Sequence, residues 1–195
     1  MRPDLMERLL FFRAFLAHPR LVGAVLPTSR RAVRAMLDMA DVPAAGQVVE
    51  LGAGTGVYTR EILARLGPQA RLLAVEIDPA LTARLAAEFG DPRVSVVCDS
   101  AENVASHLAG APADIIVSGL PFTSLGATLR RTILQRARSV LAPDGVLLVL
   151  QYSPLIRGEL RRLFGSVQGG ICPYNVPPAV LFACRNPLPT QAAPP

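Results

Sequence analysis

The fold follows from one stretch, Val48-Val49-Glu50-Leu51-Gly52-Ala53-Gly54-Thr55-Gly56. A short apolar run ends in an acidic residue, alternating glycines follow, and an amphipathic segment begins directly after them. This is the pattern of a strand, a tight turn and a helix, the first unit of a doubly wound α/β sheet. Glycines let the backbone approach a ligand closely, and a helix start offers free N–H groups that suit a carboxylate or phosphate. The stretch therefore predicts an α/β fold with a ligand site at this turn.

Two further strands end in acidic or polar residues. The strand 71–75 is followed by Glu76, 20 positions after the last glycine, where a carboxylate can accept two ribose hydroxyls. The strand 94–97 is followed by the turn 98–101, which is able to hold the edge of an adenine. Ligands of open α/β sheets lie beyond the carboxyl ends of the strands, so these acids and Glu50 are expected to face one crevice. A structural role remains open, since Glu76 and Asp99 also suit helix caps.

At these residues the chain resembles the class I S-adenosylmethionine-dependent methyltransferases, whose motif is an acidic residue followed by Gly-x-Gly-x-Gly. The resemblance covers about Gln47 to Arg185. It implies S-adenosylmethionine as cofactor and a Rossmann-like sheet of seven strands, the first five parallel and the last two forming a hairpin. The residues expected at the cofactor are Ser29, Glu50, Gly52, Ala53, Gly54, Gly56, Tyr58, Thr59, Glu76, Ile77, Asp99, Ser100, Ala101 and Ser118.

The rest of the chain alternates strands with helices, which predicts a parallel sheet with right-handed crossovers. The predicted strands are 47–51, 71–75, 94–97, 114–117, 146–151, 166–171 and 179–184. The predicted helices are 3–17, 29–40, 55–66, 79–89, 101–109, 125–141 and 155–164, with a turn at 143–145. We expect a helical extension over 1–45 that binds a membrane or acts as a lid, a cofactor-binding domain over 46–186, and a disordered tail over 187–195.

The composition is that of one basic domain. The chain has 195 residues, 51% of them hydrophobic, enough for a full core. All 20 basic residues are arginines against 15 acids, giving a net charge of +5 and a pI near 9.8. Because the planar guanidinium binds phosphate in a bidentate way, a phosphate-bearing partner is expected. The charge alone fits nucleic acid and an anionic membrane surface equally well.

Cysteine and histidine usage argues against a metal site. The three cysteines have no metal-ligand spacing and are expected to be free thiols in a reducing cytoplasm. With only two histidines, a histidine-centred metal site or catalytic triad is not expected. No apolar run approaches the roughly 20 residues of a transmembrane helix, and Arg13 interrupts the apolar start in a way that does not fit a signal peptide.

The segment 3–17 reads as a strongly apolar helix. One stripe of large apolar side chains is flanked by arginines on either side. Such a helix either packs on its own domain or lies in the headgroup layer of a membrane with its arginines reaching phosphates, and both hold if it docks and undocks. The residues expected to bind the membrane are Leu5, Arg8, Leu9, Phe12, Arg13 and Leu16.

The start of helix 29–40 is a second candidate for an anionic group. Thr28 or Ser29 suits the N-cap position, which by itself explains these hydroxyls. With Arg30 and Arg31 beside it, the same helix start suits an anionic group of cofactor or substrate.

The segment Ser118-Gly119-Leu120-Pro121-Phe122 bears on the methyl acceptor. It resembles the Asn-Leu-Pro-Tyr/Phe motif of ribosomal RNA adenine-N6 dimethyltransferases, in which the amide and a carbonyl hold the base amino group. Here neither Asn nor Asp precedes Leu-Pro. Those RNA enzymes also carry a C-terminal helical domain, which is not expected after the last predicted strand. Both departures count against a nucleic-acid substrate.

A closer resemblance is to bacterial phospholipid N-methyltransferases of the soluble, peripheral, proteobacterial type. The segments that carry it are Phe11-Phe12-x-x-Phe15, Gly23-Ala24-Val25-Leu26-Pro27-Thr28-Ser29, 49–56, 118–121 and Asn175-Val176-Pro177-Pro178-Ala179. The resemblance implies N-methylation of phosphatidylethanolamine, up to phosphatidylcholine, by a cytoplasmic monomer peripheral to the inner membrane. The alternatives are an RNA adenine methyltransferase, a small-molecule methyltransferase, and a peripheral membrane protein that merely kept a cofactor fold.

For this reaction the ammonium group of ethanolamine must first lose a proton. Tyr152 is the side chain expected to contact that nitrogen. The residues expected to act in catalysis are Tyr152, Ser118 and Asn175. The residues expected to bind the phospholipid are Thr28, Arg30, Arg31, Leu120, Pro121 and Tyr152.

Overall fold

A computed structural model describes residues 28–175 and 177–187. Its strands are β1 (Gln47–Leu51), β2 (Arg71–Glu76), β3 (Val94–Cys98), β4 (Ala113–Ser118), β5 (Leu141–Gln151), β6 (Phe164–Cys172) and β7 (Ala179–Pro187). Its α-helices are α2 (Arg30–Leu37), α3 (Val57–Leu63), α4 (Pro79–Glu88), α5 (Ala127–Val140) and α6 (Arg157–Leu163). Short 3₁₀ helices are η1 (Val42–Ala44), η2 (Ala101–His107), η3 (Phe122–Ser124) and η4 (Pro154–Ile156).

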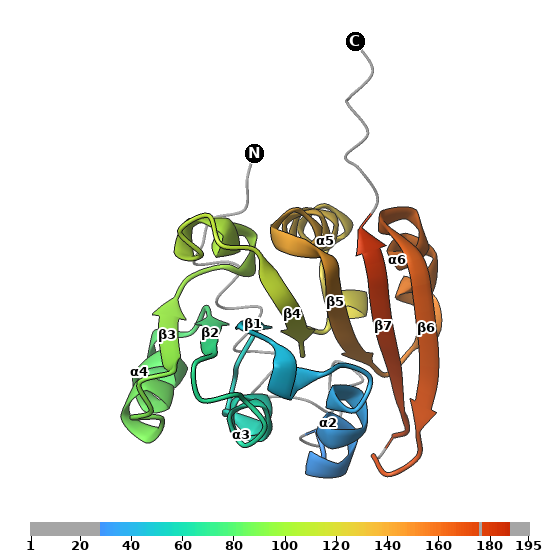
Figure 1. The fold of residues 1–195 in the computed structure, drawn as a ribbon. Helices are drawn as coiled ribbons and strands as arrows, with labels where there is room; N and C mark the ends of the chain where they lie inside the picture. The colour runs from blue at the N-terminus through green and yellow to red at the C-terminus, as the bar shows by residue number, and fades with distance from the viewer. Residues whose placement is uncertain (1–27, 176, 188–195) are drawn as a thin grey trace.

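The strands form one seven-stranded sheet in the order β3-β2-β1-β4-β5-β7-β6 (Figure 1). The pairs among β1 to β5 are parallel, and β7 runs antiparallel to both β5 and β6. This confirms the predicted fold class and its terminal hairpin. The predicted helix 3–17, with Leu5, Arg8, Leu9, Phe12, Arg13 and Leu16, and the tail from 188 onward lie outside the described residues.

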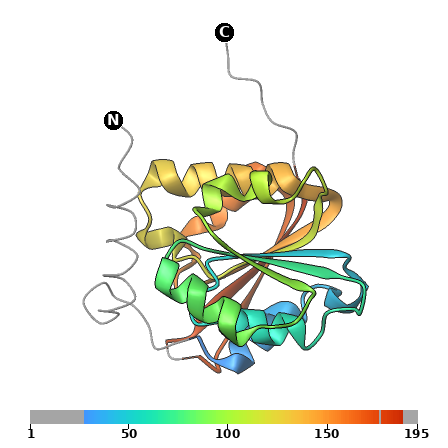
Figure 2. The same ribbon diagram turned by 90° about the vertical axis from the view of Figure 1, so that its left-hand side faces the viewer.

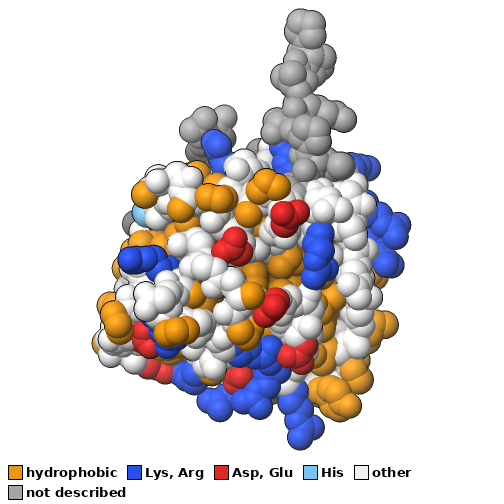
Figure 3. Space-filling model, viewed as in Figure 1, with side chains coloured by type: hydrophobic (Ala, Val, Ile, Leu, Met, Phe, Trp, Pro, Cys, Tyr) orange, Lys and Arg blue, Asp and Glu red, His pale blue; other side chains and the backbone are white. Residues whose placement is uncertain are grey.

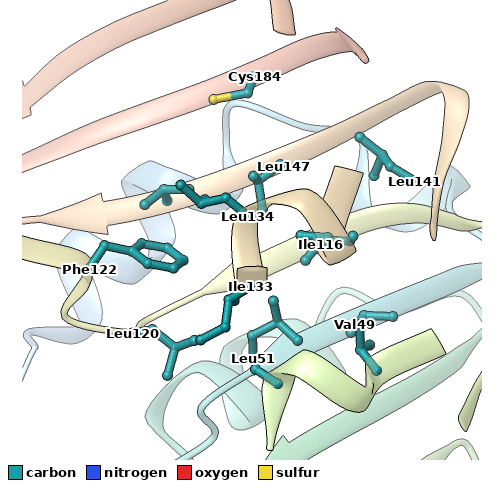
Figure 4. Close-up of a cluster of buried hydrophobic side chains, with 14 of the residues drawn as sticks. Val49, Leu51, Ile116, Leu120, Phe122, Ile133, Leu134, Leu141, Leu147 and Cys184 are labelled. Carbon is teal, nitrogen blue, oxygen red and sulfur yellow. The ribbon is translucent and has the colours of Figure 1, made fainter. Parts of the chain in front are cut away.

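Helices cover both faces of the sheet (Figure 2). One face packs against η2, α5 and α6, and its cluster includes Val49, Ile116, Leu134 and Leu147 (Figure 4). The other face packs against α2 and α3, while α4 packs on a small cluster at the β2–β3 end. Adjacent residues of a strand point to opposite faces, so continuous apolar runs such as Val48-Val49 serve both layers.

Three expectations about local structure need correction. The segment after Asp99 is a 3₁₀ helix that ends at His107, not an α-helix over 101–109. The helices α2 and α3 are shorter than the predicted 29–40 and 55–66. The predicted turn 143–145 lies inside β5, which begins at Leu141. Because the register with β4 shifts between Ala113 and Ile115, the extra residues are absorbed as an irregularity of the strand.

Candidate active site

The register of the sheet brings the predicted site residues to one edge. Leu51 at the end of β1 pairs with Val75 on one side and with Ser118 at the end of β4 on the other. Ser118 in turn pairs with Val149, near the end of β5. Glu50, Glu76 and Ser118 therefore lie at neighbouring carboxyl ends, and all three side chains are buried. The sheet thus collects at one edge residues that lie far apart in the sequence.

In the glycine turn between β1 and α3, Gly54 and Gly56 have different surroundings. Gly52, Gly54 and Gly56 all have positive φ, at 77°, 56° and 79°. A Cβ at Gly54 would have no described atom within 4 Å, whereas one at Gly56 would lie 2.8 Å from the Phe89 ring and 2.9 Å from Leu85. Gly56 thus permits packing of the turn against α4. Gly54 faces open space, which leaves backbone accessible to a ligand.

The Glu76 carboxylate holds this turn in place. Its Oε2 accepts a hydrogen bond from the Gly54 amide at 2.8 Å, and its Oε1 accepts one from the Asp78 amide at 2.9 Å. Burial raises the pKa of Glu76, and these amides offset part of that effect. A carboxylate offers about four acceptor positions, so acceptors remain for ribose hydroxyls. The cap of α4 is Asp78, which accepts from the amides of Ala80 and Leu81.

Glu50 is a buried acid with one unused oxygen. Its Oε2 accepts a hydrogen bond from the Thr59 hydroxyl at 2.7 Å. Its Oε1 is buried and has no hydrogen-bond partner among the described residues. Burial raises the pKa of Glu50 to about 7; the Thr59 hydrogen bond lowers it, and the nearby Glu76 charge raises it further. An unpaired buried carboxylate oxygen is costly, and a cationic or hydrogen-bond-donating ligand would relieve that cost.

Asp99 organises the start of η2. Its Oδ1 accepts from the Ser100 amide at 2.7 Å and from Asn103 at 2.8 Å, and its Oδ2 lies 2.7 Å from His107 Nε2. Burial opposes ionisation of Asp99, but the His107, Asn103 and Ser100 hydrogen bonds lower its pKa overall. The N-cap itself is Ser100, which accepts from the Glu102 amide. The sequence did not single out His107, and contact of this turn with adenine stays a prediction.

The loop after β4 is fixed by Gln151. The Leu120 carbonyl accepts a hydrogen bond from Gln151 Nε2 at 2.8 Å and another from the Phe122 amide at 2.9 Å. These two bonds occupy both lone pairs of that oxygen. Ser118 Oγ accepts from the Leu120 amide at 3.4 Å. The groups that sequence reasoning expected at the substrate are therefore already engaged in shaping the loop, and their contact with substrate stays a prediction.

Arg130 braces the same loop from α5. Its Nη1 donates to the carbonyls of Phe122 and Leu125, at 3.3 and 3.1 Å. Its Nε and Nη2 pair with Glu159 of α6, at 3.0 and 2.6 Å. The sequence carried no signal for this role, because one arginine among 20 has no distinguishing pattern.

The ring of Tyr58 packs against the loop after β4, residues 118–122, which is called the acceptor loop below because we expect it to bind the methyl acceptor. A Cβ at Gly119 would lie 3.0 Å from Cε2 of the Tyr58 ring and 3.5 Å from its hydroxyl oxygen. The ring thus occupies the space that a side chain at position 119 would need. The Tyr58 hydroxyl is buried and reaches no hydrogen-bond partner of normal geometry among the described residues. Burial raises the pKa of Tyr58, although the nearby Thr28 hydroxyl lowers it somewhat.

A clasp of polar contacts joins the start of α2 to the turn between β6 and β7. The Ser29 amide donates to Asn175 Oδ1 at 2.8 Å, and Ser29 Oγ donates to the Tyr174 carbonyl at 3.0 Å. Asn175 is 2% exposed, and its Nδ2 donates to the Pro177 carbonyl at 3.1 Å. Both ends of the Asn175 amide are therefore occupied. Ser29 is also the N-cap of α2, since Oγ accepts from Ala32, as one of the two expected caps.

The clasp extends to the residue after β5. The hydroxyls of Thr28 and Tyr152 lie 3.1 Å apart. Burial raises the pKa of Tyr152, while hydrogen bonds with Thr28 and Asn175 lower it, so the phenol is neutral near pH 7. Arg30 and Arg31 are exposed beside the clasp, with the Arg31 guanidinium 5.8 Å from the centroid of the Tyr174 ring. The predicted substrate-side residues thus come together, apart from Leu120 and Pro121 in the neighbouring loop.

Comparison with known proteins shows the family to which the chain belongs. A family model for a methyltransferase domain matches residues 48–145, from β1 into β5. The ornithine lipid N-methyltransferase of Singulisphaera acidiphila is 32% identical over 182 residues, which cover 91% of this chain and 95% of that protein. The chain belongs to the class I S-adenosylmethionine-dependent methyltransferases. Its cofactor is S-adenosylmethionine and its coproduct is S-adenosylhomocysteine.

Two further similarities are more limited, because one covers a short segment and the other concerns the fold alone. Ribosomal RNA small subunit methyltransferase H of Delftia acidovorans is 46% identical over 65 residues, but these cover only 33% of this chain and 21% of that protein. The crystal structure of N-methyltransferase NodS from Bradyrhizobium japonicum with S-adenosyl-L-homocysteine superposes with a TM-score of 0.71. It is 18% identical, and the match covers 82% of this chain and 87% of that chain, so this likeness concerns the fold.

The residues at the glycine turn fit the cofactor of this methyltransferase. Gly54 leaves room for close approach, Glu76 retains free acceptor positions, and Glu50 holds an unused buried carboxylate oxygen. Across the described ranges, no group of three or more His, Cys, Asp or Glu side chains is arranged to hold a metal ion. The helices within those ranges are also too short or too polar to span a membrane.

Proposed function

We propose that this methyltransferase N-methylates the amine of a lipid headgroup, with phosphatidylethanolamine as acceptor and products leading toward phosphatidylcholine. The observation that carries the proposal is the identity to the ornithine lipid N-methyltransferase along nearly the full length of both chains. That relative is named for an amine-bearing lipid. The acceptor loop supports the same class of substrate, because Gly119 replaces the amide that RNA adenine enzymes place before Leu-Pro.

The acceptor side is lined by hydroxyl groups suited to a single amine. S-adenosylmethionine, when bound, supplies a methyl group activated by a sulfonium centre. The hydroxyls of Tyr58 and Tyr152 would orient the lone pair of the acceptor nitrogen, and their raised pKa values keep both phenols neutral. The buried setting of Tyr58 favours the deprotonated amine over the ammonium. Arg30 and Arg31 are the proposed partners of the lipid phosphate.

We propose that the chain acts as a monomer on the cytoplasmic face of the inner membrane. The basic balance of 20 arginines against 15 acids supports attraction to anionic lipid. In this proposal residues 1–45 form the membrane-binding or lid extension and residues 46–186 the catalytic domain. The predicted helix 3–17 is the main anchor.

The test is methyl transfer from labelled S-adenosylmethionine to vesicles. One set contains phosphatidylethanolamine, a second replaces it with ornithine lipid, and a third contains neither; all carry the same anionic fraction, and ribosomal RNA is assayed in parallel. We expect label in the lipid fraction of the first set, with methylated ethanolamine released on hydrolysis. Label with ornithine lipid alone would assign the other headgroup. Label in RNA, which the short match to the ribosomal RNA enzyme makes a meaningful control, would refute the lipid proposal.

A further inference from the structure

Large exposed apolar side chains gather at the end of the sheet that carries the active site. Leu155 is 81% exposed, Ile171 75% and Tyr174 65%. The register places the ends of β5 and β6, which precede Leu155 and Tyr174, at the same edge of the sheet, because Gln151 at the end of β5 pairs with Val180, and Val180 pairs with Ile171. Leu155 follows β5 in η4, and Tyr174 lies in the turn after β6. Exposed apolar side chains grouped in this way mark an interaction surface.

Arginines are interleaved with these apolar side chains. The Arg31 guanidinium lies over the Tyr174 ring, and Arg157 Nη2 would lie 3.4 Å from a Cβ at Gly169, two residues before Ile171. The segments that form the surface, 28–37, 151–158 and 164–187, contain no Asp or Glu. Figure 3 shows apolar side chains at the lower right, where Figure 1 places the β6–β7 turn, with basic side chains along the lower edge.

We propose that this surface, formed by Ile171, Tyr174, Arg31 and Arg157 and here called the hairpin surface, inserts into the headgroup layer of an anionic membrane. The apolar side chains enter the boundary with the acyl chains, and the guanidinium groups contact lipid phosphates. The inference rests on the proposed lipid substrate. It adds a membrane contact within the catalytic domain, independent of the predicted helix 3–17.

The clasp explains why such a contact would serve catalysis. Tyr174 adjoins Asn175, whose side chain fastens the turn to Ser29, and Thr28 next to Ser29 contacts Tyr152. Docking of the hairpin surface would therefore turn the carboxyl-end edge of the sheet toward the bilayer. A headgroup amine could then reach the site while its acyl chains stay in the membrane.

Other partners fit the hairpin surface less well. A stable protein interface buries about 800 Å² on each side, more than a few side chains supply. Single-stranded nucleic acid is bound on successive aromatic side chains, and Tyr174 is the one aromatic residue in this group. Apolar side chains with flanking arginines, in segments that contain no Asp or Glu, match an anionic lipid surface in both charge and polarity.

The test is sedimentation of the full chain with vesicles of phosphatidylcholine and phosphatidylglycerol, without cofactor. The double variant Ile171→Glu/Tyr174→Glu should bind about tenfold more weakly, because two apolar contacts are lost and two negative charges face an anionic surface. The control is Gln135→Glu on α5, which adds a charge at another exposed position. It should bind like the wild type. Equal binding of the double variant and the wild type would overturn the proposal.

A second variant keeps the proposal testable if the first variant does not fold. Arg31→Gln/Arg157→Gln keeps the apolar side chains and should weaken binding to anionic vesicles while leaving affinity for S-adenosylmethionine unchanged. If binding to anionic vesicles is unaffected, the hairpin surface is not a membrane contact. Because sedimentation needs no methyl transfer, its result is independent of which acceptor is methylated. Transfer to a short-chain, monomeric phosphatidylethanolamine tests the proposed function separately and should be equal in wild type and in Ile171→Glu/Tyr174→Glu. Variants of Arg31 are left out of this comparison, because Arg31 is also the proposed partner of the lipid phosphate.

Discussion

The proposed cofactor side and the proposed acceptor side of the site differ in how far apart along the chain their contacting residues lie. On the cofactor side, Glu50 is bonded to Thr59 nine positions away, and Glu76 reaches Gly54 at 22 positions. On the acceptor side, Thr28 and Tyr152 are separated by 124 positions, and the clasp of Ser29 and Asn175 by 146. The first side is thus formed within two neighbouring strand–turn–helix units, and the second requires the complete sheet.

This difference predicts which substitutions act locally and which act through assembly of the domain. Changes at the glycine turn should alter packing and cofactor binding together. Changes at clasp residues other than Ser29, which is itself expected at the cofactor, should spare cofactor binding and alter the acceptor side. The groups of that side are aligned only once β5, β7 and α2 have come together.

The largest effect is expected for Gly56→Ala. A methyl group there meets Phe89 and Leu85 at under 3 Å, and the residue keeps a positive φ, so we expect a loss of about 2–5 kcal/mol in unfolding free energy. Gly54→Ala is the matched control, since it has the same backbone strain without the collision, and should lose about 1–2 kcal/mol. Urea unfolding measures both. Equal losses would show that packing against α4 is not the reason why position 56 requires glycine.

The second prediction concerns the charge of Glu50. In the unfolded chain this carboxyl has the ordinary glutamate pKa of 4.5, whereas in the folded chain burial raises its pKa to about 7. Unfolding therefore releases a proton between these values, and stability without cofactor falls as the pH rises through this window. Glu50→Gln should remove this fall and be more stable than wild type at pH 8 by roughly 2–3 kcal/mol.

For Glu50→Gln, cofactor affinity is expected to change in the opposite direction to stability. If the free oxygen of Glu50 accepts a hydrogen bond from S-adenosylmethionine, Glu50→Gln should bind it more weakly in calorimetry, despite being more stable. A variant that is more stable and binds the cofactor equally well would mean that Glu50 takes no part in the cofactor site. Parallel pH dependence of stability in wild type and variant would contradict the assigned pKa.

Asn175→Ala should act on the acceptor side. The substitution removes the bonds to Ser29 and Pro177 and leaves the Ser29 amide without its acceptor, which should cost about 1–2 kcal/mol of stability. The KM for lipid should rise as Tyr152 loses its alignment, while affinity for S-adenosylmethionine stays unchanged. Asn175→Asp, which keeps the acceptor oxygen for Ser29, should retain more activity. Equal loss in both variants would point to direct contact of the amide with substrate.

The contrast between contacts that are close and contacts that are distant in the sequence also explains what could be predicted from the sequence. Local patterns predicted the order of strands and helices, the tight glycine turn, and Ser29 as one of the two expected caps. Within the described residues the structure confirms these, except that the segment after Asp99 is a 3₁₀ helix. Local patterns could not predict that Gln151 and Arg130 hold the acceptor loop in place, because a local pattern does not specify contacts between segments that are distant in the sequence. The irregular start of β5 was missed for a similar reason, since its register depends on β4.

Tyr58 is the residue on which the two sides meet, and Tyr58→Phe should have the smallest effect on stability. The resemblance to class I methyltransferases places Tyr58 at the cofactor, and in the structure its ring lies against Gly119 of the loop after β4. Removing a buried hydroxyl that has no hydrogen-bond partner within residues 28–175 and 177–187 should change the unfolding free energy by less than about 1 kcal/mol. Tyr152→Phe, the same change at a hydroxyl bonded to Thr28, should lose more.

The kinetic result of Tyr58→Phe decides between the two placements. If the hydroxyl orients the acceptor nitrogen, kcat/KM for lipid should fall about tenfold while the affinity for S-adenosylmethionine is unchanged, since only the contact with the nucleophile is lost. If cofactor affinity falls instead, the hydroxyl belongs to the cofactor side, as its position in the sequence suggested. Because the stability change is small in either case, a loss of turnover cannot be attributed to unfolding, and the variant reports directly on which half of the site the hydroxyl serves.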